Sequence, residues 1–337
     1  MVRIITVDDV RSLIRKITLP VFFKKLMERL QTDFAAWESF EKMPRVATHL
    51  DYGVLELMPI NNDHFYAFKF VNGHPKNPLK NKLTVSAVGM LADVASGYPL
   101  LISEMTLLTA IRTAATSALA SKYLARKEAK VLAMIGCGAQ SEFQVTAHLA
   151  VFPLTQVQYF DIDPAAMEKF AHNLRNEKVK LKACKSIDEA LNSADIVITA
   201  TAAKHHSEIL HKNNIKAGMH ISGIGGDSPG KTEVGKDLLS ELKIVVEYFP
   251  QTKMEGELQN LSKQDIYAEL WELAANKKPG RENNTEITLF DSVGFALEDY
   301  SVLRLVHTLA EGLHIGHMMD MVPDVKNPKN LFTLLDF

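Results

Sequence analysis

The stretch that decides the fold is KVLAMIGCGAQSEFQVTAHLAVFPLTQVQYFDID, residues 130–163. It begins with an apolar run at 131–135, which is short enough to be a strand buried on both faces. A tight turn at 136–141 leads into a helical pattern, and a second apolar run at 157–160 ends in Asp161. Strand, glycine turn, helix, strand and acid follow one another in the order of a dinucleotide-binding βαβ unit.

The residues of the turn explain why this unit binds phosphate groups. Gly136 permits the sharp turn out of the strand, and Gly138 lets backbone N–H groups approach a pyrophosphate without an intervening Cβ. The helix that begins there offers unpaired N–H groups and a positive dipole end. Ser141 replaces the usual third Gly or Ala and is small enough for close packing. Asp161 can accept from ribose hydroxyls and would repel a 2′-phosphate, which predicts NAD rather than NADP.

The chain has 337 residues, of which 47% are hydrophobic, so it can fill the cores of two domains. A net charge of −2 gives no electrostatic reason to expect nucleic acid or an anionic membrane as a partner. No signal peptide and no run of about 18 apolar residues occurs. Two cysteines suit a reducing compartment, and we interpret Cys137 as a small residue that fills the turn rather than as a nucleophile. We expect a soluble cytoplasmic protein.

The remaining patterns divide the chain into two parts. Helical periodicity covers 8–42, and short strand-like runs separated by Gly, Asn and Pro cover 45–94, which predicts a mostly antiparallel or mixed sheet. An Ala-rich helix at 106–126 leads to 130–292, where strands and helices alternate. A last helix at 296–311 precedes a tail that we expect to pack on the first part. The predicted fold class is α/β, with a Rossmann-type doubly wound sheet and a second α+β domain.

Four ionisable residues stand in or beside apolar runs: Arg45, Glu56, Lys69 and Arg112. Taken singly, each would usually lie on a strand edge or helix rim and face water, because such residues are rarely buried without a partner. Together they favour a polar cavity. Arg45, Lys69 and Arg112 could hold a substrate carboxylate, and Glu56 could meet an amine or accept a proton.

A second cluster, SGIGGDSPGKTE at 222–233, follows a strand and therefore lies at the carboxyl edge of the sheet, where open α/β folds bind ligands. Flexible glycines flank Asp227, and Ser228 can cap a helix with Pro229 in its first turn. Asp227 is either another helix-capping acid or an acid beside the nicotinamide ring that moves protons.

Nine stretches between about 45 and 304 resemble the ornithine cyclodeaminase and μ-crystallin family, and among its members most closely the bacterial enzymes that act on ornithine. They are RVATH, GVLELMP, AFKFVNGHP, LADVASGYPLL, IRTAATSALA, IGCGAQSEFQ, GGDSPGKTE, VEYFPQTKMEGE and FDSVGFALEDY. The resemblance implies that residues 1–112 and 305–337 bind substrate and form a homodimer through their sheet. It also implies that residues 113–304 hold NAD. Ile224 and Ser228, where close relatives often carry Val and Cys, are small departures.

The resemblance also assigns roles to residues. The substrate carboxylate would meet Arg45, Lys69 and Arg112, Val293 would line the substrate pocket, and Asp227 would be the principal acid/base, assisted by Glu56. No metal is expected. NAD would be held by the turn and by residues around it: Thr84, Arg112, Gly136, Gly138, Ala139, Gln140, Ser141, Asp161, Thr201, Lys231 and Ser292.

The activity implied is the redox-neutral conversion of L-ornithine to L-proline and ammonia by transient hydride transfer, within ornithine catabolism and proline formation. Three alternatives remain open: an imine (ketimine) reductase or amino-acid dehydrogenase, a lysine cyclodeaminase, and a dinucleotide-dependent binding protein without catalysis. Ornithine and lysine differ by one methylene, worth only about 1–3 kcal/mol in an apolar pocket, so pocket shape decides between them.

Overall fold

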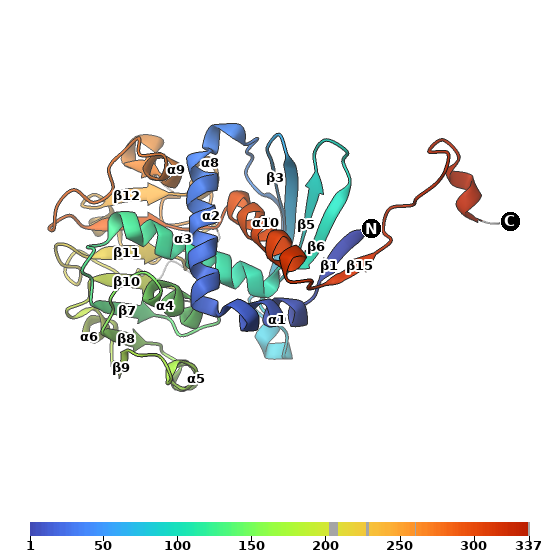
Figure 1. The fold of residues 1–337 in the computed structure, drawn as a ribbon. Helices are drawn as coiled ribbons and strands as arrows, with labels where there is room; N and C mark the ends of the chain where they lie inside the picture. Colours follow the sequence, from blue (N-terminus) through green and yellow to red (C-terminus); the bar gives the residue numbers. More distant parts are fainter. Residues whose placement is uncertain (202–207, 227–228, 260, 336–337) are drawn as a thin grey trace.

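The structure is a computed structural model that describes residues 1–201, 208–226, 229–259 and 261–335. Two β-sheets account for its strands, and helices pack between and around them (Figure 1). Among the described residues, no helix combines the length and apolar character needed to cross a bilayer.

Sheet A has seven strands in the order β15-β1-β6-β5-β4-β3-β2. Neighbours from β2 to β6 are antiparallel, β1 is parallel to β6, and β15 is antiparallel to β1. The mixed sheet predicted from the strand-like runs is confirmed. Its strands are β1 (Val2–Ile5), β2 (Val46–Leu50), β3 (Gly53–Asn61), β4 (Phe65–Gly73), β5 (Val85–Asp93), β6 (Pro99–Glu104) and β15 (His317–Met319).

Sheet B has eight parallel strands in the order β13-β12-β14-β11-β10-β7-β8-β9. The run β9-β8-β7-β10-β11 follows the 3-2-1-4-5 order of dinucleotide-binding sheets, which confirms the doubly wound prediction. Its strands are β7 (Val131–Ile135), β8 (Gln156–Phe160), β9 (Lys180–Ala183), β10 (Ile196–Thr199), β11 (His220–Gly223), β12 (Lys243–Val246), β13 (Ala268–Glu269) and β14 (Thr288–Asp291).

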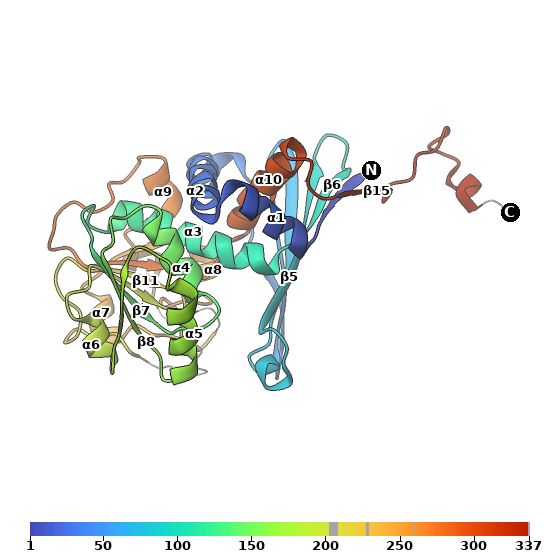
Figure 2. The ribbon, with the colours of Figure 1, turned by 60° about the horizontal axis from the view of Figure 1, so that its bottom comes forward.

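Helices cover both faces of sheet B. Figure 2 shows α4 and α5 on the side toward sheet A, and α6 and α7 on the opposite side. Alternate residues of β7 accordingly enter different apolar clusters: Leu132 and Met134 one, Ala133 and Ile135 the other. The helices that follow β7 in this part of the chain are α4 (Ser141–Leu149), α5 (Pro164–Leu174), α6 (Ile187–Leu191), α7 (Lys236–Leu239), α8 (Phe249–Thr252) and α9 (Leu270–Ala274).

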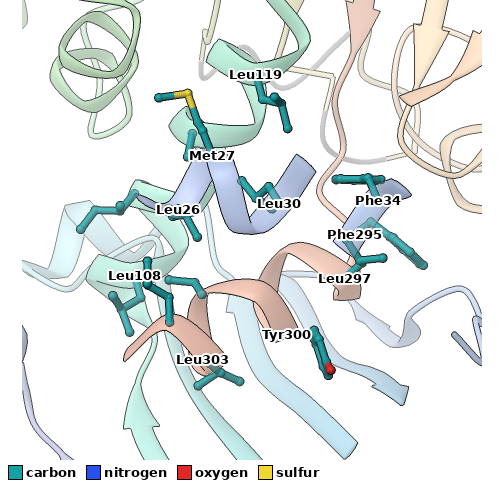
Figure 3. Packing of buried hydrophobic residues seen from close by; sticks show 14 of the residues in the cluster. Leu26, Met27, Leu30, Phe34, Leu108, Leu119, Phe295, Leu297, Tyr300 and Leu303 are labelled. Atoms are coloured by element: carbon teal, nitrogen blue, oxygen red, sulfur yellow. The ribbon is translucent and has the colours of Figure 1, made fainter. Parts of the chain in front are cut away.

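One face of sheet A is covered by helices α1 (Val7–Ile17), α2 (Leu19–Ala35), α3 (Thr106–Leu124) and α10 (Ala296–Gly312), all on the side toward sheet B (Figure 2). The Glu104 carboxylate starts α3 by accepting from the N–H groups of Leu107 and Leu108. Figure 3 shows where α2, α3 and α10 meet in a core that includes Leu30, Leu108 and Tyr300. Truncating a buried leucine of such a core to alanine costs about 2–5 kcal/mol, so α10 and α3 are firmly held.

The other face of sheet A is uncovered and apolar. Val46, Leu57, Phe70 and Val88 are paired across β2, β3, β4 and β5, so their side chains form one row on one face. They are 60%, 39%, 43% and 49% exposed. Contiguous exposed apolar surface of this kind marks an interaction site.

The C-terminal tail differs from the expectation that it packs on the first part of the chain. Only β15 does so, by pairing with β1. Residues 320–335 run away from the body (Figure 1), and their last turn, η4 (Leu331–Leu335), exposes apolar side chains. The prediction is wrong beyond β15, where the apolar side chains of η4 stay exposed and the segment before them, 320–330, is mostly polar with prolines and offers no apolar stripe to bury.

Candidate functional site

The glycine turn has the geometry that the sequence predicts. Gly136 adopts φ +95°, and a Cβ there would lie 2.5 Å from the carbonyl oxygen of Ala200, so no larger residue fits. A Cβ on Gly138 would meet open space, and both Gly138 and Ala139 are exposed. Ser141 is buried and its hydroxyl donates to the Gly138 carbonyl at 2.8 Å, which closes the turn against the helix.

The N-terminus of α4 is prepared for an anion. Its N-cap, Gln140, makes no side-chain capping bond, and Gln140 Oε1 is buried and has no hydrogen-bond partner within the described part of the chain. Free N–H groups above an open Gly138 fit the pyrophosphate of a dinucleotide. Asp161 follows β8 and its carboxylate accepts from Cys137 N at 2.6 Å, so it is held at the same turn. Cys137 is buried in the turn, and burial raises the pKa of its thiol to about 12, which is unfavourable for a nucleophile.

The other predicted cofactor contacts lie at the carboxyl edge of sheet B or across from it. The Thr201 N–H and hydroxyl donate to Glu233, and the Ser292 hydroxyl donates to Glu247 at 2.6 Å. Lys231 is partly buried, and Thr84 is exposed just before β5. Their contact with a dinucleotide stays a prediction.

Asp227 and Ser228 lie outside the described residues, so the position of the predicted acid/base is not part of the structure. The expected helix at Pro229 is wrong: Pro229 and Gly230 form a turn, and Val234 bridges Leu210. The reason is the carboxylate of Glu257, which lies behind the loop. Glu257 accepts from the N–H groups of Glu233 and Val234, which holds the backbone there in an extended form.

Arg45 is the first of the predicted cations, and it precedes β2. Its Nη1 donates to both oxygens of Glu56, at 3.0 and 3.1 Å, and its Nη2 donates to the carbonyls of Val293 (2.6 Å) and Gly294 (2.8 Å). Arg45 Nε is buried and has no hydrogen-bond partner among the described residues. A buried N–H donor without an acceptor is costly, so this nitrogen fits a ligand oxygen.

Lys69 and Arg112, from β4 and α3, both contact the start of α10. Lys69 Nζ on β4 and Arg112 Nε on α3 each donate to Asp299 Oδ1 at 2.9 Å, and Arg112 Nη1 donates to Glu298. Both cations are almost completely buried, as is Glu56. Glu56 and Lys69 point to the face of sheet A that α10 covers, because they alternate with the exposed Leu57 and Phe70.

The loop between β14 and α10 joins these two groups of residues. Gly294 has φ +77°, and a Cβ there would lie 2.5 Å from Arg112 Nη1, while its carbonyl accepts from Arg45. Glu247, directly after β12, accepts from the Ser292 hydroxyl and from the N–H groups of Val293 (3.0 Å) and Gly294 (3.2 Å). The structure therefore brings Arg45, Lys69, Arg112, Glu56 and Val293 into one site.

Burial dominates the electrostatics of this site. Burial and the positive charge of Arg112 together lower the pKa of Lys69 to about 8, and Asp299 opposes the shift. Burial would lower the pKa of Arg112 too, but the Asp299 and Glu298 carboxylates raise it above its ordinary value. Burial, with Glu247 and Asp299 nearby, raises the pKa of Glu298 to about 8 against the effect of Arg112.

Four acids that hold the site and its loops in place were missed in the sequence: Glu247, Glu257, Glu298 and Asp299. Glu247 and Glu257 are the second and the last residue of the VEYFPQTKMEGE run, and Glu298 and Asp299 belong to FALEDY. Acids within apolar runs were the available signal, and it was applied to Glu56 alone. Within the part of the chain that the structure describes, no group of His, Cys, Asp or Glu side chains could hold a metal ion. Two buried arginines and a lysine are instead suited to a carboxylate.

Comparisons with known proteins agree with this geometry. The model of the ornithine cyclodeaminase/mu-crystallin family matches residues 8–313. An ornithine cyclodeaminase of Agrobacterium fabrum is 47% identical over 335 residues, which are 99% of this chain and 95% of that protein.

Two solved structures share the fold over nearly their whole length. An archaeal alanine dehydrogenase dimer with bound NAD is 31% identical, with a TM-score of 0.87 over 95% of this chain and 99% of that one. A lysine cyclodeaminase, whose structure concerns recognition of L-lysine, L-ornithine and L-2,4-diaminobutyric acid, is 26% identical. Its TM-score is 0.90 over 97% of this chain and 98% of that one.

Proposed function

Since the chain belongs to the ornithine cyclodeaminase/mu-crystallin family, we propose that it converts L-ornithine to L-proline and ammonia with NAD as a catalytic cofactor. The observation that carries the proposal is the convergence of Arg45, Lys69 and Arg112, from three different elements, in one buried site. The 47% identity to an ornithine cyclodeaminase over nearly the whole chain supports the choice of substrate.

The glycine turn fits the cofactor, since α4 has an uncapped N-terminus above an open Gly138. When bound, NAD⁺ supplies a hydride acceptor and then a hydride donor for the substrate Cα, so the conversion is redox-neutral overall. We assign NAD binding to the glycine turn, to Asp161 and to the other residues predicted around them. The full set is Thr84, Arg112, Gly136, Gly138, Ala139, Gln140, Ser141, Asp161, Thr201, Lys231 and Ser292.

The substrate's carboxylate is the group that this site can bind most strongly. Arg45 Nε is a buried donor without an acceptor among the described residues, and Lys69 has further N–H bonds beyond the one to Asp299. With Arg112 they would fix the α-carbon, and Val293 would line the pocket beside it. Charge-assisted hydrogen bonds are about twice as strong as neutral ones, and they set the orientation that the reaction needs.

Proton transfer is the second task of the side chains. The δ-amine must lose a proton before it can attack, and the departing α-amine must gain one to leave as ammonia. We assign this transfer to Asp227, assisted by Glu56. Arg45 bonds both oxygens of Glu56, which orients the carboxylate and leaves its remaining lone pairs for an ammonium group.

We also propose that the chain acts as a homodimer in the cytoplasm. The uncovered row of Val46, Leu57, Phe70 and Val88 on sheet A fits the same face of a second copy. Both cysteines are free, as suits a reducing compartment. In this proposal residues 1–112 and 305–337 form the substrate-binding and dimerisation domain, and residues 113–304 form the NAD-binding domain.

The test is incubation of the protein with L-ornithine and a trace of NAD, with assays for ammonia and proline and a record of reduced-cofactor absorbance. We expect proline and ammonia in equal amounts without net reduction of NAD. Stoichiometric formation or consumption of NADH would indicate a dehydrogenase or imine reductase. Faster turnover of L-lysine would reassign the substrate, and ligand binding without ammonia release would refute catalysis.

A further inference from the structure

Two adjacent acids, Glu298 and Asp299, lie in the first turns of α10 beside Lys69 and Arg112, and both are buried. The proposed reaction uses the cations, but it assigns no role to these acids. Glu298 has a structural role, because its carboxylate accepts from Phe295 N and so caps the N-terminus of α10. Asp299 makes no such capping bond, so its presence in the core needs another explanation.

A single oxygen of Asp299 ties a strand of sheet A to a helix. Its Oδ1 accepts from Lys69 Nζ on β4 and from Arg112 Nε on α3, both at 2.9 Å. Its Oδ2 is buried and has no partner among the described residues. Since Lys69 and Arg112 share one acceptor, their positive groups lie side by side although like charges repel.

The position of this oxygen is fixed by the core. Tyr300 and Leu297, the neighbours of Asp299 on α10, are fully buried in the cluster where α2, α3 and α10 meet (Figure 3). Asp299 therefore cannot follow a displaced cation, and it defines where the cations stand. Fixed placement of charged groups is what binding in a preorganised site requires.

We propose that Asp299 is a positioning residue, which holds Lys69 and Arg112 side by side so that both face one substrate carboxylate. This inference rests on the proposed function, since it concerns how the same site binds its amino acid. It extends that function to a residue that makes no contact with the reacting atoms.

The charges around Lys69 support this role. The charged groups that face it are Asp299 from α10, Arg112 from α3 and Arg45 from the segment before β2. Burial and the two arginines lower the pKa of Lys69 to about 8, and Asp299 is the group that opposes them. Glu298 does not replace it, because its carboxylate accepts from Arg112 Nη1 and from Phe295 N and makes no bond to Lys69 among the described residues. Without Asp299, Lys69 would lose its proton at a lower pH.

The test compares Asp299→Asn with Asp33→Asn. Asp33 is a matched control, since it is also buried and accepts from Ser301 of α10 at 2.8 Å, but it touches none of the three cations. The Michaelis parameters for L-ornithine are measured from about pH 6 to pH 9 with saturating NAD. For Asp299→Asn we expect a KM at least about tenfold higher, a smaller change in kcat, and a rise of KM that begins at a lower pH. Asp33→Asn should keep the wild-type KM and pH profile.

Asp299→Glu covers the case in which Asp299→Asn does not fold. It keeps the charge but moves the carboxylate by one methylene, so KM should rise while its dependence on pH stays close to that of the wild type. A folded variant of either kind with the wild-type KM at every pH would overturn the inference, and so would a fall in kcat alone. Failure of the wild-type protein to form proline would instead overturn the proposed function, and this inference with it.

Discussion

Replacing Gly294 by alanine tests whether the loop after β14 sets the position of Arg112. Gly294 has φ +77°, in the left-handed region, and an added Cβ would lie 2.5 Å from Arg112 Nη1 and 2.9 Å from Nη2. Real Cβ atoms do not come so close to nitrogen, so either the loop or the guanidinium has to move. The loop is held by three hydrogen bonds to Glu247, and the guanidinium by its bonds to Asp299 and Glu298.

The magnitude follows from these two constraints. A left-handed conformation costs a residue with a Cβ about 1–2 kcal/mol. Displacing Arg112 breaks at least one hydrogen bond between charged groups, worth about 1.5–3 kcal/mol. We therefore expect Gly294→Ala to lower the free energy of unfolding by about 3–5 kcal/mol and to raise KM for L-ornithine by about tenfold or more, because Arg112 no longer faces the substrate carboxylate.

Gly97→Ala is the matched control. Gly97, in the turn between β5 and β6, has φ +74°, but a Cβ there would meet nothing within 4 Å. Gly97→Ala should lower the free energy of unfolding only by the backbone cost of about 1–2 kcal/mol, and KM for L-ornithine should stay unchanged. Urea unfolding and steady-state kinetics of both variants provide the comparison. Equal losses of stability in the two variants, together with a wild-type KM for Gly294→Ala, would refute the reasoning.

Three further predictions concern other parts of the molecule. Gly136→Ala should abolish NAD binding and lower stability, because its Cβ would meet a backbone oxygen, whereas Gly138→Ala should weaken only NAD binding, measured by NADH fluorescence. Burial raises the pKa of Glu257 from 4.5 to about 7, so the folded protein binds more protons than the unfolded chain between these pH values, and this contribution to stability is lost as pH rises; Glu257→Gln should remove that part of the pH dependence in urea unfolding. Phe70→Glu should yield monomers in sedimentation velocity, while Val7→Glu, equally exposed but off the row, should not.

The sequence predicted the main secondary-structure elements well, because local patterns of residues determine them. The glycine turn, the apolar runs of sheet B and the helix at α10 all depend on residues near one another in the chain. The three clustered cations were also found, since Arg45, Lys69 and Arg112 stand in or beside apolar runs. Their proximity was inferred from residue type and number alone. In the structure Asp299 joins Lys69 to Arg112, and the Gly294 loop brings Arg45 to Arg112.

What sequence could not provide is the pairing of groups far apart in the chain. Glu247 and the loop at Ser292 are 45 residues apart, and only the adjacency of β12 and β14 brings them together. The adjacency of β12 and β14 is not readable from their own composition, because the central strands of sheet B, such as β7, β10 and β12, are similar apolar runs. The tail was mispredicted because the local pattern of its residues does not show which distant part of the chain it would pack on.

Strands β3 and β4 place side chains on both faces of sheet A, so their register determines which residues face the site. Side chains alternate along a strand, so Glu56 and Lys69 face α10 while their neighbours Leu57 and Phe70 face outward. A shift of register by one residue would exchange the two sets, placing apolar residues in the site and charges on the uncovered face. In the proposed homodimer, a second copy on the outer face would oppose such a shift and would stabilise the strands that carry Glu56 and Lys69. The same strand register would then determine both the proposed dimer surface and the proposed substrate site.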